Sequence, residues 1–362
     1  MKRKLICLLI AGVLVAFSGC GMNQTAGKEQ NKAGSTQKEE NEAETGDEVS
    51  ESRDIFAMDT YMTVTAYGAD AEAAVDDAEA EINRLDALLS TGDKESEVAR
   101  LNVNKSGMLS EDGGYLVERA LELYDETDGA FDIAVYPIMQ AWGFPTKQFQ
   151  VPQQSTLDAL LPLADASKIQ YDTAARVISF AQEGMEIDLG GIAKGYTSSR
   201  VVDIFKEHGI TSGLINLGGN VQALGTKTDG SDWRVAVQSP DDSDDYIGVL
   251  SIRDKAVITS GGYERYFEKD GVTYHHIIDP STGYPAETGL KSVTIVSNDG
   301  TLADGLSTSL FVMGKEKAFE FWKKHSDEFD FILMAEDDTL SVSEGIAAAF
   351  SSDYDTEVIR QD

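Results

Sequence analysis

Two oxygen-bearing side chains, Asp304 and Thr308, stand four residues apart in the segment 303–308, ADGLST. At the start of a helix, residues i and i+4 lie on one face, so this carboxylate and hydroxyl would point the same way. They would form half of the oxygen shell that Mg²⁺ prefers, with backbone carbonyls, water and phosphate completing it. The alternative is that Asp304 is an ordinary helix N-cap, because Asp is favoured there.

A second candidate is the segment 188–196, DLGGIAKGY, in which a glycine pair precedes an expected helix. Glycines let a backbone approach a ligand closely, and the first turn of a helix offers unpaired N–H groups to phosphate. Lys194 would add a positive charge there. The alternative is a tight strand-to-helix turn with a surface lysine, and the LGGN run at 217–220 is better explained as a β-turn.

The third candidate is the segment 275–283, HHIIDPSTG, where an expected strand ends in an Asp-Pro turn. A histidine and an aspartate together, here His276 and Asp279, suggest acid–base chemistry. Side chains alternate between the two faces of a strand, so only one of His275 and His276 can face a site. A structural role for the histidine pair is the alternative.

Several kinds of site are excluded. No G-x-G-x-x-G, G-x-x-x-x-G-K-[ST] or G-x-S-x-G sequence occurs, so neither a Rossmann fingerprint, a P-loop nor a nucleophile elbow is supported. The two cysteines, Cys7 and Cys20, both precede the candidate sites, which excludes a disulfide, a cysteine-ligated zinc ion or a cysteine nucleophile there. The formal net charge of −33 argues against direct binding to nucleic acid or anionic lipid.

The elements that must position these side chains are mixed helices and strands. Apolar spacing of three or four residues predicts helices over 70–90, 115–127, 194–208, 303–313 and 315–324. Short β-rich runs predict strands over 63–67, 213–217, 233–237, 247–252, 256–259, 272–278, 292–296 and 330–334. The elements do not alternate strictly, so we expect an α+β fold in one continuous unit over residues 53–362.

The first fifty residues predict export. Three positive residues precede an apolar run over 5–17, which is short for a membrane span and typical of a signal peptide. The run ends FSGC at Cys20, which resembles a lipobox although Phe17 replaces the usual Leu. We expect a signal peptide over 1–19, a lipid anchor on Cys20 at the extracytoplasmic face of the cell membrane, and a flexible polar tether over 20–52. An uncleaved anchor or an ordinary signal peptide is the alternative.

The motifs occur together in an order that resembles the ApbE family, the FAD:protein FMN transferases. The matching elements cover most of residues 55–350: MDT at 58–60, TDGAFD at 127–132, the segments 188–196 and 216–220, SGGY at 260–263, and the segments 276–283 and 304–308. The resemblance implies the ApbE fold and an enzyme in which a protein Thr or Ser hydroxyl attacks the riboflavin-side phosphorus of FAD. AMP then leaves, and FMN stays attached through a phosphoester.

The resemblance also implies roles for individual residues. Mg²⁺ would be held by the backbone carbonyl of Gly191 and the side chains of Asp304 and Thr308. A base must remove the hydroxyl proton, and an aspartate or a histidine could do so. We expect Asp304 to be this base, with His276 assisting by orienting the nucleotide. The residues expected to bind FAD are Met58, Ala130, Phe131, Asp132, Asp188 and Lys194, with Asp279 near the nucleotide.

Two departures from the family pattern leave the FAD affinity open. Asp59 stands where the family usually has Gly, and Gly92 stands where many members carry an aromatic residue that packs on FAD. Alternatives to the transferase are a hydrolase that cleaves FAD to FMN and AMP, and an FAD-binding lipoprotein without catalysis. The segment 304–309 is also similar to the acceptor motif of the family, which raises self-flavinylation.

The expected partners follow from the resemblance and the anchor. Acceptors would be exported flavoproteins, such as subunits of Rnf-type or sodium-pumping Nqr-type electron-transfer complexes. A tether of about thirty residues reaches roughly 30 Å, so these acceptors would be displayed near the same membrane face.

Overall fold

The computed structural model describes residues 49–362. The predicted signal peptide, the lipid anchor at Cys20 and most of the predicted tether lie outside these residues. Strand β1 begins at Ser50, so the folded unit starts three residues before the predicted boundary at residue 53. Within residues 49–362, no helix combines the length and apolar character needed to cross a membrane.

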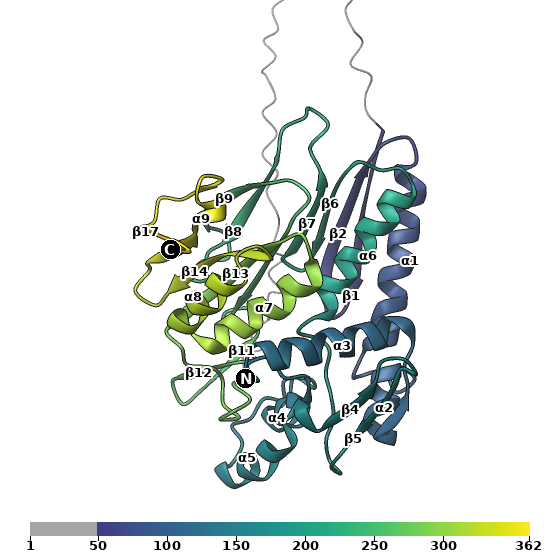
Figure 1. The fold of residues 1–362 in the computed structure, drawn as a ribbon, viewed down its shortest axis with the longest axis vertical. Helices are drawn as coiled ribbons and strands as arrows, with labels where there is room; N and C mark the ends of the chain where they lie inside the picture. The colour runs from purple at the N-terminus through teal and green to yellow at the C-terminus, as the bar shows by residue number, and fades with distance from the viewer. Residues whose placement is uncertain (1–48) are drawn as a thin grey trace, which may run out of the picture. The chain divides into compact units, whose positions relative to one another are not determined.

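A nine-stranded sheet runs through the molecule in the order β1-β2-β6-β7-β10-β13-β14-β15-β17 (Figure 1). All neighbouring strands pair antiparallel except β15 and β17, which are parallel. Its strands are β1 Ser50–Ala57, β2 Thr60–Tyr67, β6 Ser212–Leu217, β7 Asn220–Gly225, β10 Ala256–Gly261, β13 Leu290–Ser297, β14 Phe329–Ala335, β15 Leu340–Ser343 and β17 Thr356–Ile359.

Smaller sheets and helices complete the fold. The other strands are β3 Ser106–Met108, β4 Ile169–Asp172 and β5 Val177–Phe180 in one sheet, β8 Trp233–Gln238, β9 Tyr246–Ile252 and β16 Phe350–Ser351 in another, and the hairpin of β11 Tyr266–Lys269 and β12 Val272–His275. The helices are α1 Ala71–Leu89, α2 Glu97–Asn104, α3 Glu111–Glu126, α4 Tyr136–Trp142, α5 Gln154–Leu160, α6 Ala193–Glu207, α7 Gly300–Met313, α8 Lys315–Lys324 and α9 Glu344–Ala347.

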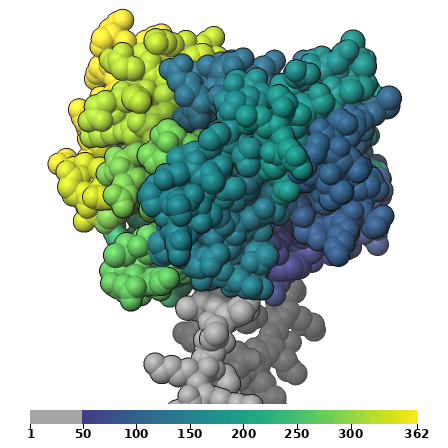
Figure 2. All heavy atoms as spheres, turned by 90° about the horizontal axis from the view of Figure 1, so that it is seen from below, coloured from purple at the N-terminus to yellow at the C-terminus, as the bar shows by residue number. Residues whose placement is uncertain are grey.

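The nine-stranded sheet lies between two layers because its side chains alternate. Phe331 and Leu333 of β14 pack in the cluster that contains the buried residues of α7, whereas Ile332 and Met334 pack with β8 and β9. The segment with α3, α4 and α5, coloured blue to teal, covers the middle of the face in Figure 2. The mixed architecture confirms the predicted α+β class.

The observed elements correct several predicted boundaries. The strand expected over 272–278 ends at His275, and Ile278 makes only an isolated bridge to Pro285. Helix α7 begins at Gly300, and its N-cap is Asp299, which accepts hydrogen bonds from the N–H groups of Thr301 and Leu302. Asp304 therefore lies in the second turn of the helix, and the N-cap explanation for it is wrong.

Helices α6 and α7 cross with their backbones in close approach. A Cβ atom on Gly195 would lie 2.0 Å from the carbonyl oxygen of Gly300, and a Cβ on Gly300 would lie 2.6 Å from that of Gly195. No other residue fits at either position without moving a helix, because real Cβ contacts are never so short. This glycine contact brings Asp304 of α7 against the first turn of α6.

A buried carboxylate fastens the loop after α3. Asp132 is 7% exposed, and its two oxygens accept hydrogen bonds from the N–H groups of Ala134 at 2.7 Å and Ala166 at 3.2 Å. Burial raises the pKa of Asp132 to about 6, which these two hydrogen bonds only partly offset.

Substitution of Gly195 by Ala tests the helix crossing. Overpacking should lower the free energy of unfolding by about 1–3 kcal/mol, measured by urea denaturation. Gly107→Ala in β3 is the matched control, because a Cβ there meets no atom within 4 Å, and we expect a change within about 0.5 kcal/mol. Equal stability of the two variants would contradict the close crossing.

The raised pKa of Asp132 predicts a pH dependence. Because the pKa is higher in the folded than in the unfolded protein, the protonated carboxyl stabilises the fold below about pH 4, and this contribution is lost as the pH rises through about 6. From pH 4 to 7, the wild type should lose about 2–3 kcal/mol of unfolding free energy relative to Asp132→Asn. Parallel pH profiles of the two proteins would refute the assignment.

Candidate functional site

Asp304 is held by donors from two other elements. Its Oδ2 accepts a hydrogen bond of 2.8 Å from the N–H of Gly195 in the first turn of α6, and its Oδ1 accepts one of 3.0 Å from Nδ2 of Asn220 at the start of β7. The first N–H groups of a helix have no partner within the helix, so this turn can donate hydrogen bonds to a carboxylate. Asp304 is 4% exposed.

The charge of Asp304 is not balanced by a bonded cation. Burial raises the pKa of this carboxyl, while the nearby charge of Lys194 and the hydrogen bonds from Gly195 and Asn220 act in the opposite direction. Among residues 49–362, no Lys, Arg or His nitrogen lies within ion-pair distance of its oxygens. A buried carboxylate with only neutral hydrogen-bond donors is electrostatically suited to a bound cation.

The other expected metal-binding groups lie in α7 and just before α6. Thr308 lies one turn beyond Asp304 in α7 and is half-buried, with its Oγ1 3.3 Å from Oγ of Ser260. Gly191 precedes α6 and packs on Phe131, whose Cε2 would lie 3.1 Å from a Cβ at this position. A carboxylate, a hydroxyl and a carbonyl are hard oxygen donors, so the set fits Mg²⁺. Within the described chain, no group of three His, Cys, Asp or Glu residues forms a metal site.

A second group of charged side chains lies around His276. Burial, followed by the positive charges of Arg265 and Lys194, lowers the pKa of His276 to about 3, so its imidazole is neutral at pH 7. Its Nδ1 lies 3.2 Å from the carbonyl oxygen of Arg265. Because a carbonyl only accepts, Nδ1 carries the proton and Nε2 is an acceptor.

Two carboxylates share this environment. Glu264 keeps solvent-exposed surface, yet the protein around its carboxyl raises its pKa to about 7, with Lys194 opposing the rise and Asp304 adding to it. Burial also raises the pKa of Asp188, which accepts a hydrogen bond of 2.9 Å from the N–H of Gly190 and feels the charge of Arg265. The charges of Lys194 and Arg265 therefore act on Asp188, Glu264 and Asp304, the carboxylate of the expected metal site.

The hairpin turn between β1 and β2 approaches α6 from the other side. Met58 and Asp59 have φ angles of 48° and 62°, so both are in the left-handed region that a two-residue type I′ turn requires. This conformation accounts for the glycine that the family resemblance expects at position 59, and Asp is among the residues that tolerate it. The sulfur of Met58 lies 3.9 Å from Oγ1 of Thr197 in α6.

The remaining predicted residues have mainly structural contacts. Ala130 and Phe131 form the turn after α3, and the N–H of Phe131 donates to Oγ1 of Thr127 at 3.1 Å. The carboxylate of Asp132 is occupied by two backbone N–H groups. Asp279 accepts hydrogen bonds from the N–H and hydroxyl of Ser281 within its own turn.

Helix α7 disfavours self-flavinylation. Ser307 and Ser309 are both fully buried, and their hydroxyls donate to the backbone carbonyls of Asp304 and Gly305. Thr308 is half-buried and belongs to the expected metal site. No serine of the motif-like segment 304–309 is therefore open to a nucleotide.

Sequence reasoning missed four residues of this site: Asn220, Ser260, Glu264 and Arg265. Asn220 and Ser260 lie within motif segments, but their partners Asp304 and Thr308 are 84 and 48 positions away along the chain. Only the paired strands β7 and β10 bring these side chains to α7. The charged pair of Glu264 and Arg265, directly after SGGY, was the one available signal.

The chain is similar in sequence to proteins of known family. The ApbE family pattern matches residues 58–333. The FAD:protein FMN transferase of Treponema pallidum is 34% identical over 288 residues, which cover 74% of this chain and 80% of that protein. A protein of the same name from Klebsiella pneumoniae is 36% identical over 251 residues, covering 68% of this chain and 77% of the relative.

A solved structure shares the fold. The crystal structure of the ApbE protein from Thermotoga maritima superposes with a TM-score of 0.77 at 32% sequence identity, covering 82% of this chain and 98% of that one. The family match spans the turn at Met58, the start of α6 and the Asp304 segment of α7, which are the elements that build the site. The chain therefore belongs to the ApbE family.

Proposed function

We propose that this protein is a magnesium-dependent enzyme that transfers FMN from FAD to a Thr or Ser hydroxyl of other proteins and releases AMP. The observation that carries the proposal is the buried carboxylate of Asp304, which lies at the first turn of α6 beside Thr308 and forms no ion pair with a side chain of residues 49–362. The relatives named FAD:protein FMN transferase support the choice of substrate and product.

The proposed metal ligands are the carboxylate of Asp304, the hydroxyl of Thr308 and the carbonyl of Gly191. The carboxylate has about four lone-pair sites, of which the bonds from Gly195 and Asn220 use two, so it can still bind a cation. When bound, Mg²⁺ would neutralise the pyrophosphate and stabilise the charge that develops on the leaving phosphate.

The nucleotide-binding role falls on positive groups of the same region. The first turn of α6 contributes the positive end of the helix dipole, although its N–H groups at Ala193 and Gly195 already donate to Leu189 and Asp304. Lys194 and Arg265 add formal charges that act on neighbouring side chains. These groups would hold the pyrophosphate of FAD with its riboflavin-side phosphorus open to the acceptor hydroxyl. Met58, Phe131 and Asp188 lie around this turn and complete the proposed FAD site.

The hydroxyl proton must pass to a base, and the structure favours His276 over Asp304. Both oxygens of Asp304 already accept hydrogen bonds. His276 is neutral, and its Nε2 makes no hydrogen bond within residues 49–362. An anionic pyrophosphate beside Lys194 and Arg265 would offset their charges and raise the pKa of His276, making it a better proton acceptor.

The location and the acceptors are part of the proposal. A lipid on Cys20 would hold the enzyme at the extracytoplasmic face of the membrane, and its acceptors would be exported flavoproteins of the Rnf or Nqr type. The supporting features are the apolar run over 5–17 and the FSGC sequence that ends at Cys20.

Removal of the metal or of Asp304 tests the function. The protein is incubated with FAD, Mg²⁺ and an acceptor domain that carries a D-g-x-[ST]-x-T motif, and covalent FMN on the acceptor is measured by intact mass. We expect transfer by the wild type, loss of transfer in EDTA, and at least a tenfold lower rate for Asp304→Asn. Asp330→Asn is the control, because it alters another partly buried carboxylate, bonded to Ser343, outside the site.

The same incubation separates the alternatives. Free FMN and AMP without a modified acceptor would identify a hydrolase, and unchanged FAD in the presence of Mg²⁺ would identify a binding protein. Full transfer activity of Asp304→Asn would rule out the metal site as assigned.

An aromatic side chain at position 92 should strengthen FAD binding. A Cβ at Gly92 meets only Oγ of Ser90, at 3.7 Å, so a larger side chain has room. We expect Gly92→Tyr to lower the Kd for FAD about 2- to 10-fold by stacking, measured by quenching of flavin fluorescence, with Gly92→Ala as the control. Equal affinity of the two variants would show that FAD does not contact this position.

A further inference from the structure

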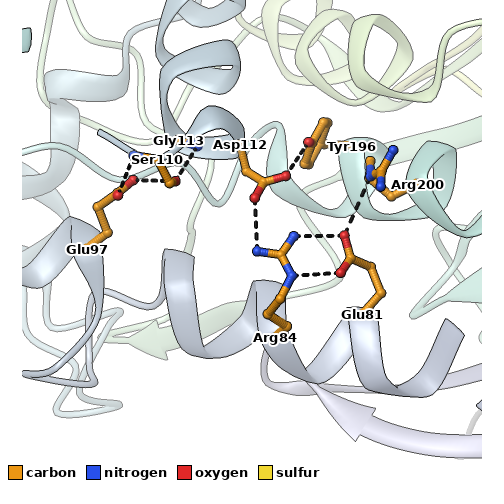
Figure 3. A network of polar contacts seen from close by, with 8 residues as sticks. All are labelled: Glu81, Arg84, Glu97, Ser110, Asp112, Gly113, Tyr196 and Arg200. Carbon is orange, nitrogen blue, oxygen red and sulfur yellow. Dashed lines mark hydrogen bonds and ion pairs between the residues drawn. The ribbon is translucent and has the colours of Figure 1, made fainter. Parts of the chain in front are cut away.

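A network of charged side chains joins α1, α3 and α6 beside the site (Figure 3). Arg84 of α1 donates to both carboxylate oxygens of Glu81 at 2.7 and 2.8 Å. Its Nη1 donates to Oδ2 of Asp112, in the first turn of α3, at 2.9 Å. The two-pronged pair with Glu81 fixes the orientation of the Arg84 guanidinium as well as its distance. Arg84 therefore holds Asp112 in a defined place.

Helix α6 enters this network through two side chains (Figure 3). The hydroxyl of Tyr196 donates to Oδ1 of Asp112 at 2.6 Å, and Nε of Arg200 lies 3.5 Å from Oε1 of Glu81. The side chains of Glu81 and Asp112 are only 13% and 16% exposed. The carboxylates of Glu81 and Asp112 therefore face the guanidiniums of Arg84 and Arg200.

Asp112, which accepts the hydrogen bond from Tyr196, lies in a helix turn that is itself held by hydrogen bonds. Ser110 caps α3 by accepting from the N–H of Gly113, and Glu97 at the start of α2 accepts from the backbone N–H of Ser110 at 2.6 Å and from its hydroxyl at 3.0 Å. Burial acts to raise the pKa of Asp112, but the hydrogen bonds from Arg84 and Tyr196 outweigh it and lower the pKa. Asp112 is therefore a charged, fixed acceptor at neutral pH.

Tyr196 directly follows Gly195, whose N–H binds Asp304. We propose that Tyr196, through its hydrogen bond to Asp112, is a positioning residue that sets the direction of the N–H groups holding the carboxylate of Asp304, and thereby the affinity of the site for a divalent cation. The inference rests on the proposed metal-dependent function.

The physical reason is that the first turn of α6 is fixed by few contacts of its own. Gly195 and Gly300 set how closely α6 and α7 approach, and Val201, Val202 and Phe205 anchor the later turns of α6 in the core. The Tyr196 hydroxyl and the Tyr196–Tyr115 ring contact, with centroids 5.3 Å apart, tie the first turn to α3 and set its local orientation. The direction of the Gly195 N–H then follows.

The test is the affinity for Mn²⁺, a paramagnetic substitute for Mg²⁺, measured by electron paramagnetic resonance of the free ion, without FAD or acceptor. Tyr196→Phe should raise the Kd for Mn²⁺ threefold or more. Mutation of a residue that hydrogen-bonds a metal ligand typically lowers the metal affinity about 10- to 100-fold, and Tyr196 acts one residue further from the ligand. Tyr124→Phe is the matched control, since it removes a similar bond of 3.0 Å from a tyrosine of α3 to Asp165. We expect less than a twofold change for it.

A second variant keeps the test independent of any folding defect in Tyr196→Phe. Asp112→Ala should weaken Mn²⁺ binding to a similar degree, and adding Tyr196→Phe to it should have no further effect, because the two residues act through one bond. Equal Kd values for wild type, Tyr196→Phe and Asp112→Ala would overturn the inference. Absence of Mn²⁺ binding by the wild type would instead contradict the proposed metal site.

Discussion

The hydrogen bond from the N–H of Gly195 to the carboxylate of Asp304 is the contact on which the proposed site depends. It exists only because Gly195 and Gly300 let α6 and α7 meet backbone to backbone. The same contact places Asp304 against the first turn of α6, one helical turn from the hydroxyl of Thr308 and near the charge of Lys194. One helix crossing therefore brings a buried carboxylate and a positive charge into the same site.

The charges near Asp304 and His276 are not balanced by the surrounding side chains, and this imbalance indicates which ligands the site would bind. Burial raises the pKa of the Asp304 carboxyl, which its neutral hydrogen-bond donors only partly offset, so in the absence of a cation the charged carboxylate costs stability. Nearby, burial and then the charges of Arg265 and Lys194 lower the pKa of His276 to about 3. Both strains would be relieved together by a cation at Asp304 and a pyrophosphate beside Lys194, which is the ligand set that the proposed reaction requires.

Much of the fold could be predicted from local pattern. The apolar spacing predicted α1, α6 and α8 within a few residues, because each helix buries one regular face. Nine strands of the described chain were not predicted: β1, β3, β4, β5, β7, β11, β15, β16 and β17. All of these except β1 and β7 have two to four residues, which is too few for a clear alternating pattern. The start of α7 was placed three residues late, because Asp304 resembles a cap while the true cap is Asp299.

Some residues of the candidate site could likewise be predicted from the sequence, and others could not. Asp304, Thr308 and Gly191 were predicted because their motif segments are contiguous in sequence. Asn220 was not predicted as a partner of Asp304, because the sheet brings together residues that no local pattern relates. Asp132 and Asp279 were assigned to FAD. The carboxylate of Asp132 accepts hydrogen bonds from Ala134 and from the distant Ala166, and that of Asp279 accepts them from Ser281 in its own turn, contacts that only the three-dimensional structure reveals.

The most direct test of the central claim is a crystal structure of the protein soaked with Mn²⁺ and FAD, with the ion located by its anomalous scattering. We expect one ion bound by the carboxylate of Asp304, the hydroxyl of Thr308 and the carbonyl of Gly191, with the pyrophosphate of FAD at the first turn of α6. An ion bound elsewhere, or FAD bound with no ion at Asp304, would contradict the account.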